Sequence, residues 1–160
     1  MQLYAKPLLK EQVIILSQYD CCSPDFSAGN FSFGSRMYQI FSSLEDAIKQ
    51  ACTIYSYHIL NDGPPSDVED MLGALKNTVG RIPNYTPGEN ALAWVYFIAA
   101  AESTTAVKRT FFAKRLMGIY ERGTFSDVTS AFTVLHQIWR FQETDNSWTK
   151  VLMQMPLVMK

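Results

Sequence analysis

The stretch Asn90-Ala-Leu-Ala-Trp-Val-Tyr-Phe-Ile-Ala-Ala-Ala-Glu102 decides the fold, because no residue between Ala91 and Ala101 carries a charge. As an α-helix, this run rises about 16 Å. That is roughly half the thickness of a bilayer core, so the run does not predict a membrane span. A helix without a polar side must be covered by neighbours. The sequence therefore predicts a helix that is buried inside a helical domain.

The composition sets limits on the class of protein. The 160 residues are 48% hydrophobic and 13% aromatic, which suffices for one domain with a sizeable core. A net charge of -1 gives no overall attraction to nucleic acid or to anionic lipid. The odd, sparse set Cys21, Cys22 and Cys52 is typical of a reducing compartment, so we expect a nuclear or cytoplasmic protein. Cys21 and Cys22 are either a redox-sensitive pair or plain free thiols.

The chain divides into three parts of one domain. Residues 1–19 favour an N-terminal helix, although the apolar run from Val13 to Leu16 also fits a strand. Residues 20–43, rich in Ser, Gly and aromatic residues, are expected to form a long loop. Residues 44–160 show repeated helix signals and are expected to form the helical core.

Start and stop residues mark the expected helices. One helix begins near Ser43 and ends at Asn61-Asp62-Gly63-Pro64-Pro65. Ser66 and Glu69 have the spacing of a capping box, which predicts the start of the next helix. Thr86-Pro87-Gly88-Glu89 opens the central helix, expected at residues 88–102.

Three further helices are expected after the break at Ser103-Thr104-Thr105. One closes at Gly123, one opens at Ser126, and a short one carries Trp148 and ends before Pro156. No strand pattern of comparable strength is present in the sequence. We therefore predict an all-α, single-domain bundle of about six or seven helices around the central helix. The apolar residues 155–159 are expected to pack on the body or across a dimer interface.

The sequence offers no constellation for catalysis or metal binding. The spacings that place two metal ligands on one helix face are missing, so we expect no metal and no cofactor. His58 lies on an apolar stripe, which favours a hydrogen-bonded core histidine. We expect no catalytic residues; an enzyme would have to use scattered groups, namely Glu102, Glu121, Asp127 and His136.

Basic residues recur every seven positions in the segment after the central run. Lys108, Arg115 and Arg122 form this stripe, with Arg109 and Lys114 beside them. One interpretation is a solvated face opposite Phe112 and Leu116. The other is a contact for an acidic partner surface.

A family resemblance is carried by the central run and its neighbours. Pro87 and Glu89 lead into Leu92-Ala-Trp94, Phe97-Ile-Ala-Ala-Ala-Glu102 follows, and Leu135-His-Gln-Ile-Trp139 comes later. Together with Ala47-Ile-Lys-Gln-Ala51 and Ile54-Tyr55, this pattern resembles the C-terminal regulatory region of fungal binuclear zinc-cluster transcription factors. Val95 stands where that family often has proline, and Ala100 where it often has glycine. Three cysteines cannot form the six-cysteine cluster, so the resemblance implies no DNA binding through a zinc cluster.

The resemblance implies a regulatory module that contacts a protein partner, associates with itself or senses a hydrophobic small molecule. In some relatives the helices enclose an apolar pocket. Here the residues that could line one, or could simply pack as core, are Trp94, Phe97, Phe111, Phe112, Tyr120, Phe132 and Trp139. The leading hypothesis is thus the non-enzymatic effector region of a transcription factor. The alternatives are a stand-alone helical binding protein, such as an accessory protein of a biosynthetic pathway, and an all-α enzyme.

Overall fold

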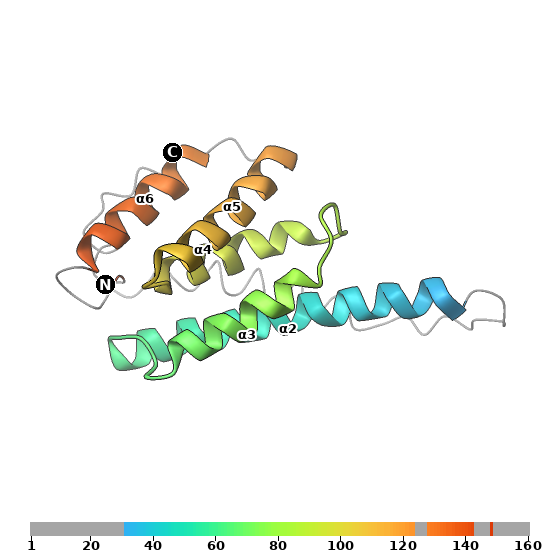
Figure 1. The fold of residues 1–160 in the computed structure, drawn as a ribbon, viewed down its shortest axis with the longest axis horizontal. Helices are drawn as coiled ribbons and strands as arrows, with labels where there is room; N and C mark the ends of the chain where they lie inside the picture. Colours follow the sequence, from blue (N-terminus) through green and yellow to red (C-terminus); the bar gives the residue numbers. More distant parts are fainter. Residues whose placement is uncertain (1–30, 124–127, 143–147, 149–160) are drawn as a thin grey trace, which may run out of the picture. The chain divides into compact units, whose positions relative to one another are not determined.

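The computed structural model describes residues 31–123, 128–142 and Trp148, nearly all of which belong to one compact unit, Phe33–Lys160. They form five α-helices and one 3-10 turn, and no strand occurs among them. In chain order these are α2 (Phe31–Asn61), α3 (Val68–Gly80), η1 (Glu89–Ala91), α4 (Leu92–Glu102), α5 (Ala106–Arg122) and α6 (Val128–Phe141) (Figure 1). The all-α class is confirmed. The expected N-terminal helix and the apolar tail lie outside the described residues.

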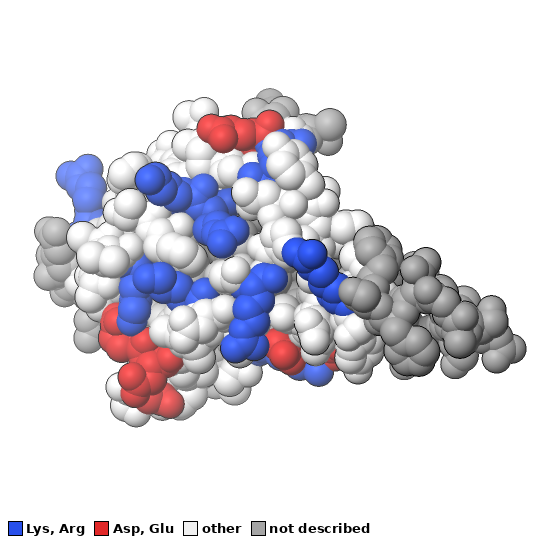
Figure 2. Space-filling view, turned by 45° about the vertical axis from the view of Figure 1, so that its right-hand side comes forward, with Lys and Arg blue, Asp and Glu red and all other residues white. Residues whose placement is uncertain are grey.

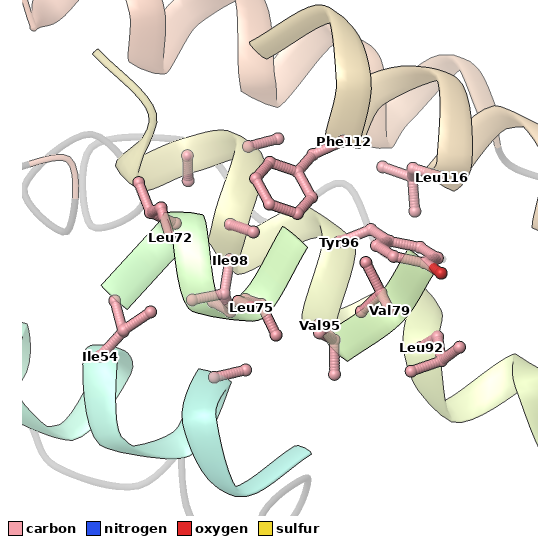
Figure 3. Close-up of a cluster of buried hydrophobic side chains, with 14 of the residues drawn as sticks. Ile54, Leu72, Leu75, Val79, Leu92, Val95, Tyr96, Ile98, Phe112 and Leu116 are labelled. Carbon is pink, nitrogen blue, oxygen red and sulfur yellow. The ribbon is translucent and has the colours of Figure 1, made fainter. Parts of the chain in front are cut away.

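Helix α4 occupies the centre of this unit, as its composition predicts. None of its residues is exposed, and Val95, Ala99, Ala100 and Ala101 are fully buried. Figure 3 shows side chains of α4 between those of α2 and α3 on one side and those of α5 on the other. In the described part of the chain, no helix is both long and apolar enough to cross a membrane. The apolar run therefore forms a core helix about half a bilayer long.

The C-terminal end of α4 is capped by other elements. Ser103 turns out of the helix into an extended conformation, and its amide makes a hydrogen bond of 3.1 Å to the Ala99 carbonyl and a longer one of 3.3 Å to the Ala100 carbonyl. The indole Nε1 of Trp139 on α6 donates to the Ala100 carbonyl at 2.8 Å, and the Gln142 amide donates to the Ala101 carbonyl. Arg109 on α5 donates from Nε to the Ser103 carbonyl at 2.8 Å. The predicted break at residues 103–105 is thus the point where α4, α5 and α6 meet.

Helix α2 corrects one expectation. The residues 31–43 were expected to belong to a loop, but α2 begins at Phe31 and continues without interruption to Asn61. Adding residues to an existing helix costs far less free energy than nucleating one, so this polar and aromatic stretch extends the helix that residues 44–61 form. The extension has no periodic apolar stripe because most of it faces solvent, including Tyr38. Its end at Asn61 is as predicted.

The start of α3 corrects a second expectation, the capping box of Ser66 and Glu69. Ser66 and Glu69 do not form a capping box, because the residue that precedes the helix is Asp67, which makes no side-chain cap. The Glu69 carboxylate instead accepts a hydrogen bond from Thr104, at 2.6 Å, and pairs with Lys108. The central helix also begins later than expected: the 3-10 turn η1 covers Glu89–Ala91 before α4 starts.

Candidate functional site

Two basic residues of α5, Lys108 and Arg122, pair with acidic residues of the same domain. Lys108 pairs with the Glu69 carboxylate of α3 and donates to the Glu69 carbonyl at 2.8 Å. The hydrogen bond from Lys108 to the carboxylate is the main reason why the pKa of Glu69 lies below its ordinary value, and the hydrogen bond from Thr104 lowers the pKa further. Lys108 therefore fastens α5 to α3 in this structure.

Arg122, at the other end of α5, makes a two-pronged contact with η1. Its Nε lies 3.0 Å from Oε1 of Glu89, and its Nη2 lies 3.1 Å from Oε2. The guanidinium is also stacked 5.2 Å from the centre of the Tyr85 ring. This geometry matches the planar fork of arginine to a carboxylate, and the hydrogen bonds to Glu89 raise the pKa of Arg122.

Between these two anchors, α5 borders an open hollow of about 370 Å³. The residues that line it are Asn84, Phe111, Lys114, Arg115, Gly118 and Arg122. Three of them carry a positive charge and none carries a negative charge. Figure 2 shows that lysine and arginine side chains gather across one face of the molecule.

The cations beside the hollow surround the aromatic ring of Phe111. Nζ of Lys76 on α3 lies 4.9 Å from the ring centre, and the Arg115 guanidinium carbon lies 5.7 Å from it. Arg115 also donates to the Asn84 side chain at 3.4 Å, while Lys114 is exposed. We call this hollow the basic hollow; Phe111, Lys114 and Arg115 belong to its lining, and Lys76 lies beside it over the Phe111 ring. It presents positive charge around an apolar floor, a combination that suits an acidic segment carrying an aromatic or aliphatic side chain.

The structure thus treats the three stripe residues differently. Arg115 lies at the basic hollow, whereas Lys108 and Arg122 form ion pairs within the domain. The sequence pattern placed Lys114 beside the stripe without singling it out. The packing of α5 places Lys114 at the edge of the basic hollow. The sequence could not show this, because its periodicity does not tell which basic residues of a helix lie opposite carboxylates.

The seven aromatic residues of the expected apolar pocket are distributed over the core. Phe112 is fully buried, and the other six are half-buried and pack against the core cluster. Trp94 makes an edge contact with Tyr55, with ring centres 5.8 Å apart, and Phe111 makes one with Phe112 at 5.1 Å. Of the seven, Phe111 is the one that lines the basic hollow. A ligand pocket made by these residues stays a prediction.

A polar cluster lies inside the core, at the opposite end of α4 from η1. Nδ1 of His58 on α2 lies 2.6 Å from Oε1 of Glu102 on α4, and both side chains are almost fully buried. The indole Nε1 of Trp148 donates a hydrogen bond to the same oxygen at 2.7 Å. The prediction that His58 is a core histidine with a polar partner is confirmed. We call His58, Glu102 and Trp148 the buried polar cluster.

The other residues that the sequence offered for catalysis do not share the burial and the contacts of this cluster. Glu121 and His136 are exposed, and Asp127 lies outside the described residues. Burial raises the pKa of the Cys52 thiol, which lowers the thiolate fraction at neutral pH. Among the residues that the structure describes, no group of three His, Cys, Asp or Glu side chains is arranged to hold a metal ion.

Comparison with known proteins gives one match. The model of the family described as fungal specific transcription factor domain matches residues 12–159, which is most of the chain. No curated protein and no solved structure matches.

Proposed function

Because the chain belongs to the fungal specific transcription factor domain family, we propose that it is a regulatory module that binds a protein partner and performs no catalysis. Under this proposal it acts in the nucleus, and the partner is an acidic segment that binds at the basic hollow. The observation that carries the proposal is the lining of that hollow, in which Lys114 and Arg115 lie beside the ring of Phe111 and none of the lining residues is acidic.

The local charges explain why an acidic partner is favoured. Arg122 is already paired with Glu89, so the cations that remain for a partner are Lys114 and Arg115, with Lys76 beside them. Carboxylates of a partner would meet these side chains at the rim, where they are partly solvated. Rim charges of this kind mainly raise the association rate and make it sensitive to salt.

The apolar floor supplies the second part of the recognition. Phe111 is half-buried between α3 and α5, and Tyr85 nearby is 78% exposed. An aromatic or aliphatic side chain of the partner can cover the exposed part of the Phe111 ring and remove that surface from water. Segments that alternate acidic and hydrophobic residues provide this combination and are typical of disordered activation regions.

The proposal is tested with a synthetic peptide in which Asp and Glu alternate with Phe and Leu. The variant Lys114→Glu with Arg115→Glu should weaken binding of this peptide, measured by fluorescence anisotropy, by tenfold or more, because each reversal replaces an attraction by a repulsion. The matched control is Arg36→Glu with Arg81→Glu. These residues line a different hollow of about 470 Å³ that also contains Asp46.

The control variant should bind the peptide as the wild type does. Unchanged binding by the α5 variant, with a circular-dichroism spectrum like that of the wild type, contradicts the proposal. So does an equal loss in the control variant, because it would show that only the net charge matters. A peptide with Lys in place of Asp and Glu should not bind.

A further inference from the structure

The buried polar cluster places ionisable side chains in a core that is otherwise mostly apolar. His58 is fully buried, Glu102 is 2% exposed and Trp148 is 1% exposed. Taking a carboxylate and an imidazole out of water carries a desolvation cost, and apolar residues of similar volume often stabilise a core as well or better. A buried ion pair is therefore weak evidence of a stabilising role. The kind of group that these side chains can bind is more informative about what the cluster does.

The cluster recognises the indole of Trp148 in two ways. Its N–H group donates to Oε1 of Glu102 at 2.7 Å, which fixes the ring edge that carries the nitrogen. Its ring lies against two other rings, with centres 5.1 Å from His58 and 6.2 Å from Tyr55. A hydrogen bond to a carboxylate together with aromatic contacts is specific for a flat heteroaromatic group with an N–H donor.

Three separate segments build this cluster. His58 comes from the last turns of α2, Glu102 from the last residue of α4, and Trp148 from a position 46 residues after Glu102. The carboxylate and the imidazole are thus held by two helices of the core, one of which is the central helix. The indole comes from a third part of the chain, donates to the Glu102 carboxylate and lies against the His58 ring.

We infer that Glu102, His58 and Tyr55 form a binding site for a planar aromatic group with an N–H donor, and that the chain fills this site with its own Trp148. This inference goes beyond partner binding at the basic hollow and uses none of the same residues. A free molecule of the same chemical class, such as an indole, then competes with Trp148 for the Glu102 carboxylate. Because Trp148 is tethered at a high effective concentration, the competitor binds the intact chain more weakly than a chain without that side chain.

The experiment removes the resident ring and supplies it from solution. Trp148→Ala is mixed with indole, or with benzothiophene, which has the same shape but no N–H donor, and binding is measured by calorimetry and by the melting temperature. Indole should bind and raise the melting temperature. Benzothiophene should bind about tenfold more weakly or worse, because it leaves the buried carboxylate without that donor.

Two further variants show whether Glu102 is responsible. In Trp148→Ala with Glu102→Leu, the preference for indole over benzothiophene should disappear. The control is Trp94→Ala, since Trp94 contacts the same Tyr55 through its ring edge; this cavity should not prefer indole. Equal binding of the two ligands by Trp148→Ala overturns the inference, and so does a preference that survives the change of Glu102.

The intact chain provides a second measurement should Trp148→Ala fail to fold. The indole N–H signal of Trp148 is identified in an NMR spectrum by its loss in Trp148→Phe. Excess indole should shift or weaken this signal before the signals of Trp94 and Trp139, and benzothiophene should leave it in place. A Trp148 signal that does not respond to indole overturns the inference.

Discussion

Lys108 on α5 holds Glu69 on α3 at two points, through the carboxylate and through the main-chain carbonyl, which accepts a hydrogen bond at 2.8 Å. Thr104, in the turn that precedes α5, donates to the same carboxylate at 2.6 Å. The acidic residue that the sequence suggested as a helix cap is therefore an attachment point between two helices. This arrangement fixes the direction in which α5 leaves the central turn and presents its basic hollow.

The Lys108–Glu69 contact should make stability depend on pH. The pKa of Glu69 is lowered in the folded protein, first by Lys108, so the carboxylate stabilises the fold above its ordinary pKa and loses this effect as the pH falls through the lowered value. Lys108→Met should lower the free energy of unfolding by about 1 kcal/mol or less at pH 7, since Glu69 is 42% exposed. Urea denaturation at several pH values measures the difference.

The difference between Lys108→Met and the wild type should become smaller in the acid range, where the ion pair is lost and only the hydrogen bond to the Glu69 carbonyl and the packing of Lys108 remain. Lys114→Met, on the same helix but exposed, is the control and should show little change at any pH. A deficit that stays constant from pH 7 down into the acid range would mean that packing, and not the ion pair, accounts for the effect.

Gly118 and Arg122 should be coupled. A methyl group on Gly118 would lie 2.8 Å from Nη1 of Arg122, so the guanidinium must shift from the position in which it bonds Glu89. Replacing glycine by alanine inside a helix otherwise stabilises by about 1 kcal/mol. We expect Gly118→Ala to give this gain in the Arg122→Ala background and a smaller gain, or a loss, in the wild type. A double-mutant cycle from urea denaturation measures the coupling, and equal gains in the two backgrounds would refute it.

Trp139→Phe should weaken the cap on the central helix. The change keeps an aromatic ring but removes the donor that lies 2.8 Å from the Ala100 carbonyl, a group near the end of a buried helix. We expect a loss of about 1–2 kcal/mol, which corresponds to a decrease in Tm of several degrees for a domain of this size. Trp94→Phe is the comparison, and calorimetry that finds the two variants equally stable would argue against this role of the indole.

Ala100→Leu should be poorly tolerated. Ala100 is fully buried where α4 is surrounded by other helices, so the added carbon atoms would have to displace neighbouring side chains. Overpacking of this kind costs about 1–3 kcal/mol. Ala93, on the same helix but half-buried, has more room, and Ala93→Leu should cost less. Thermal unfolding compares the two, and an Ala100→Leu protein as stable as the wild type would show that α4 is not enclosed there.

Local patterns predicted much of this fold. The uncharged run from Ala91 to Ala101 predicted the central helix, because a helix without a polar face has only one stable environment. Thr105 and Gly123 bound α5 as expected, and the Thr105 side chain accepts from the Lys108 amide. These features depend on neighbours within a few residues, which is the range that periodicity and capping rules cover.

Contacts between distant residues were beyond such patterns. Glu102 reads as the polar end of an apolar run, yet its partners are His58 and Trp148, on other segments. The stripe residues Lys108 and Arg122 pair with carboxylates from α3 and η1. Two of the three charges that the sequence suggested for a partner are therefore already neutralised within the domain. The one available signal was His58, whose place on an apolar stripe indicated a buried polar partner without identifying it.

Hydrogen–deuterium exchange with and without the acidic peptide tests the central claim, that this domain acts through the basic hollow. The account predicts that the amides of α4 exchange slowest in the free protein and that the peptide adds protection in residues 108–122. It predicts no change in the outward face of α2 around Tyr57 and Leu60. Peptide-induced protection located on α2, or none on α5 at saturating peptide, would contradict the account.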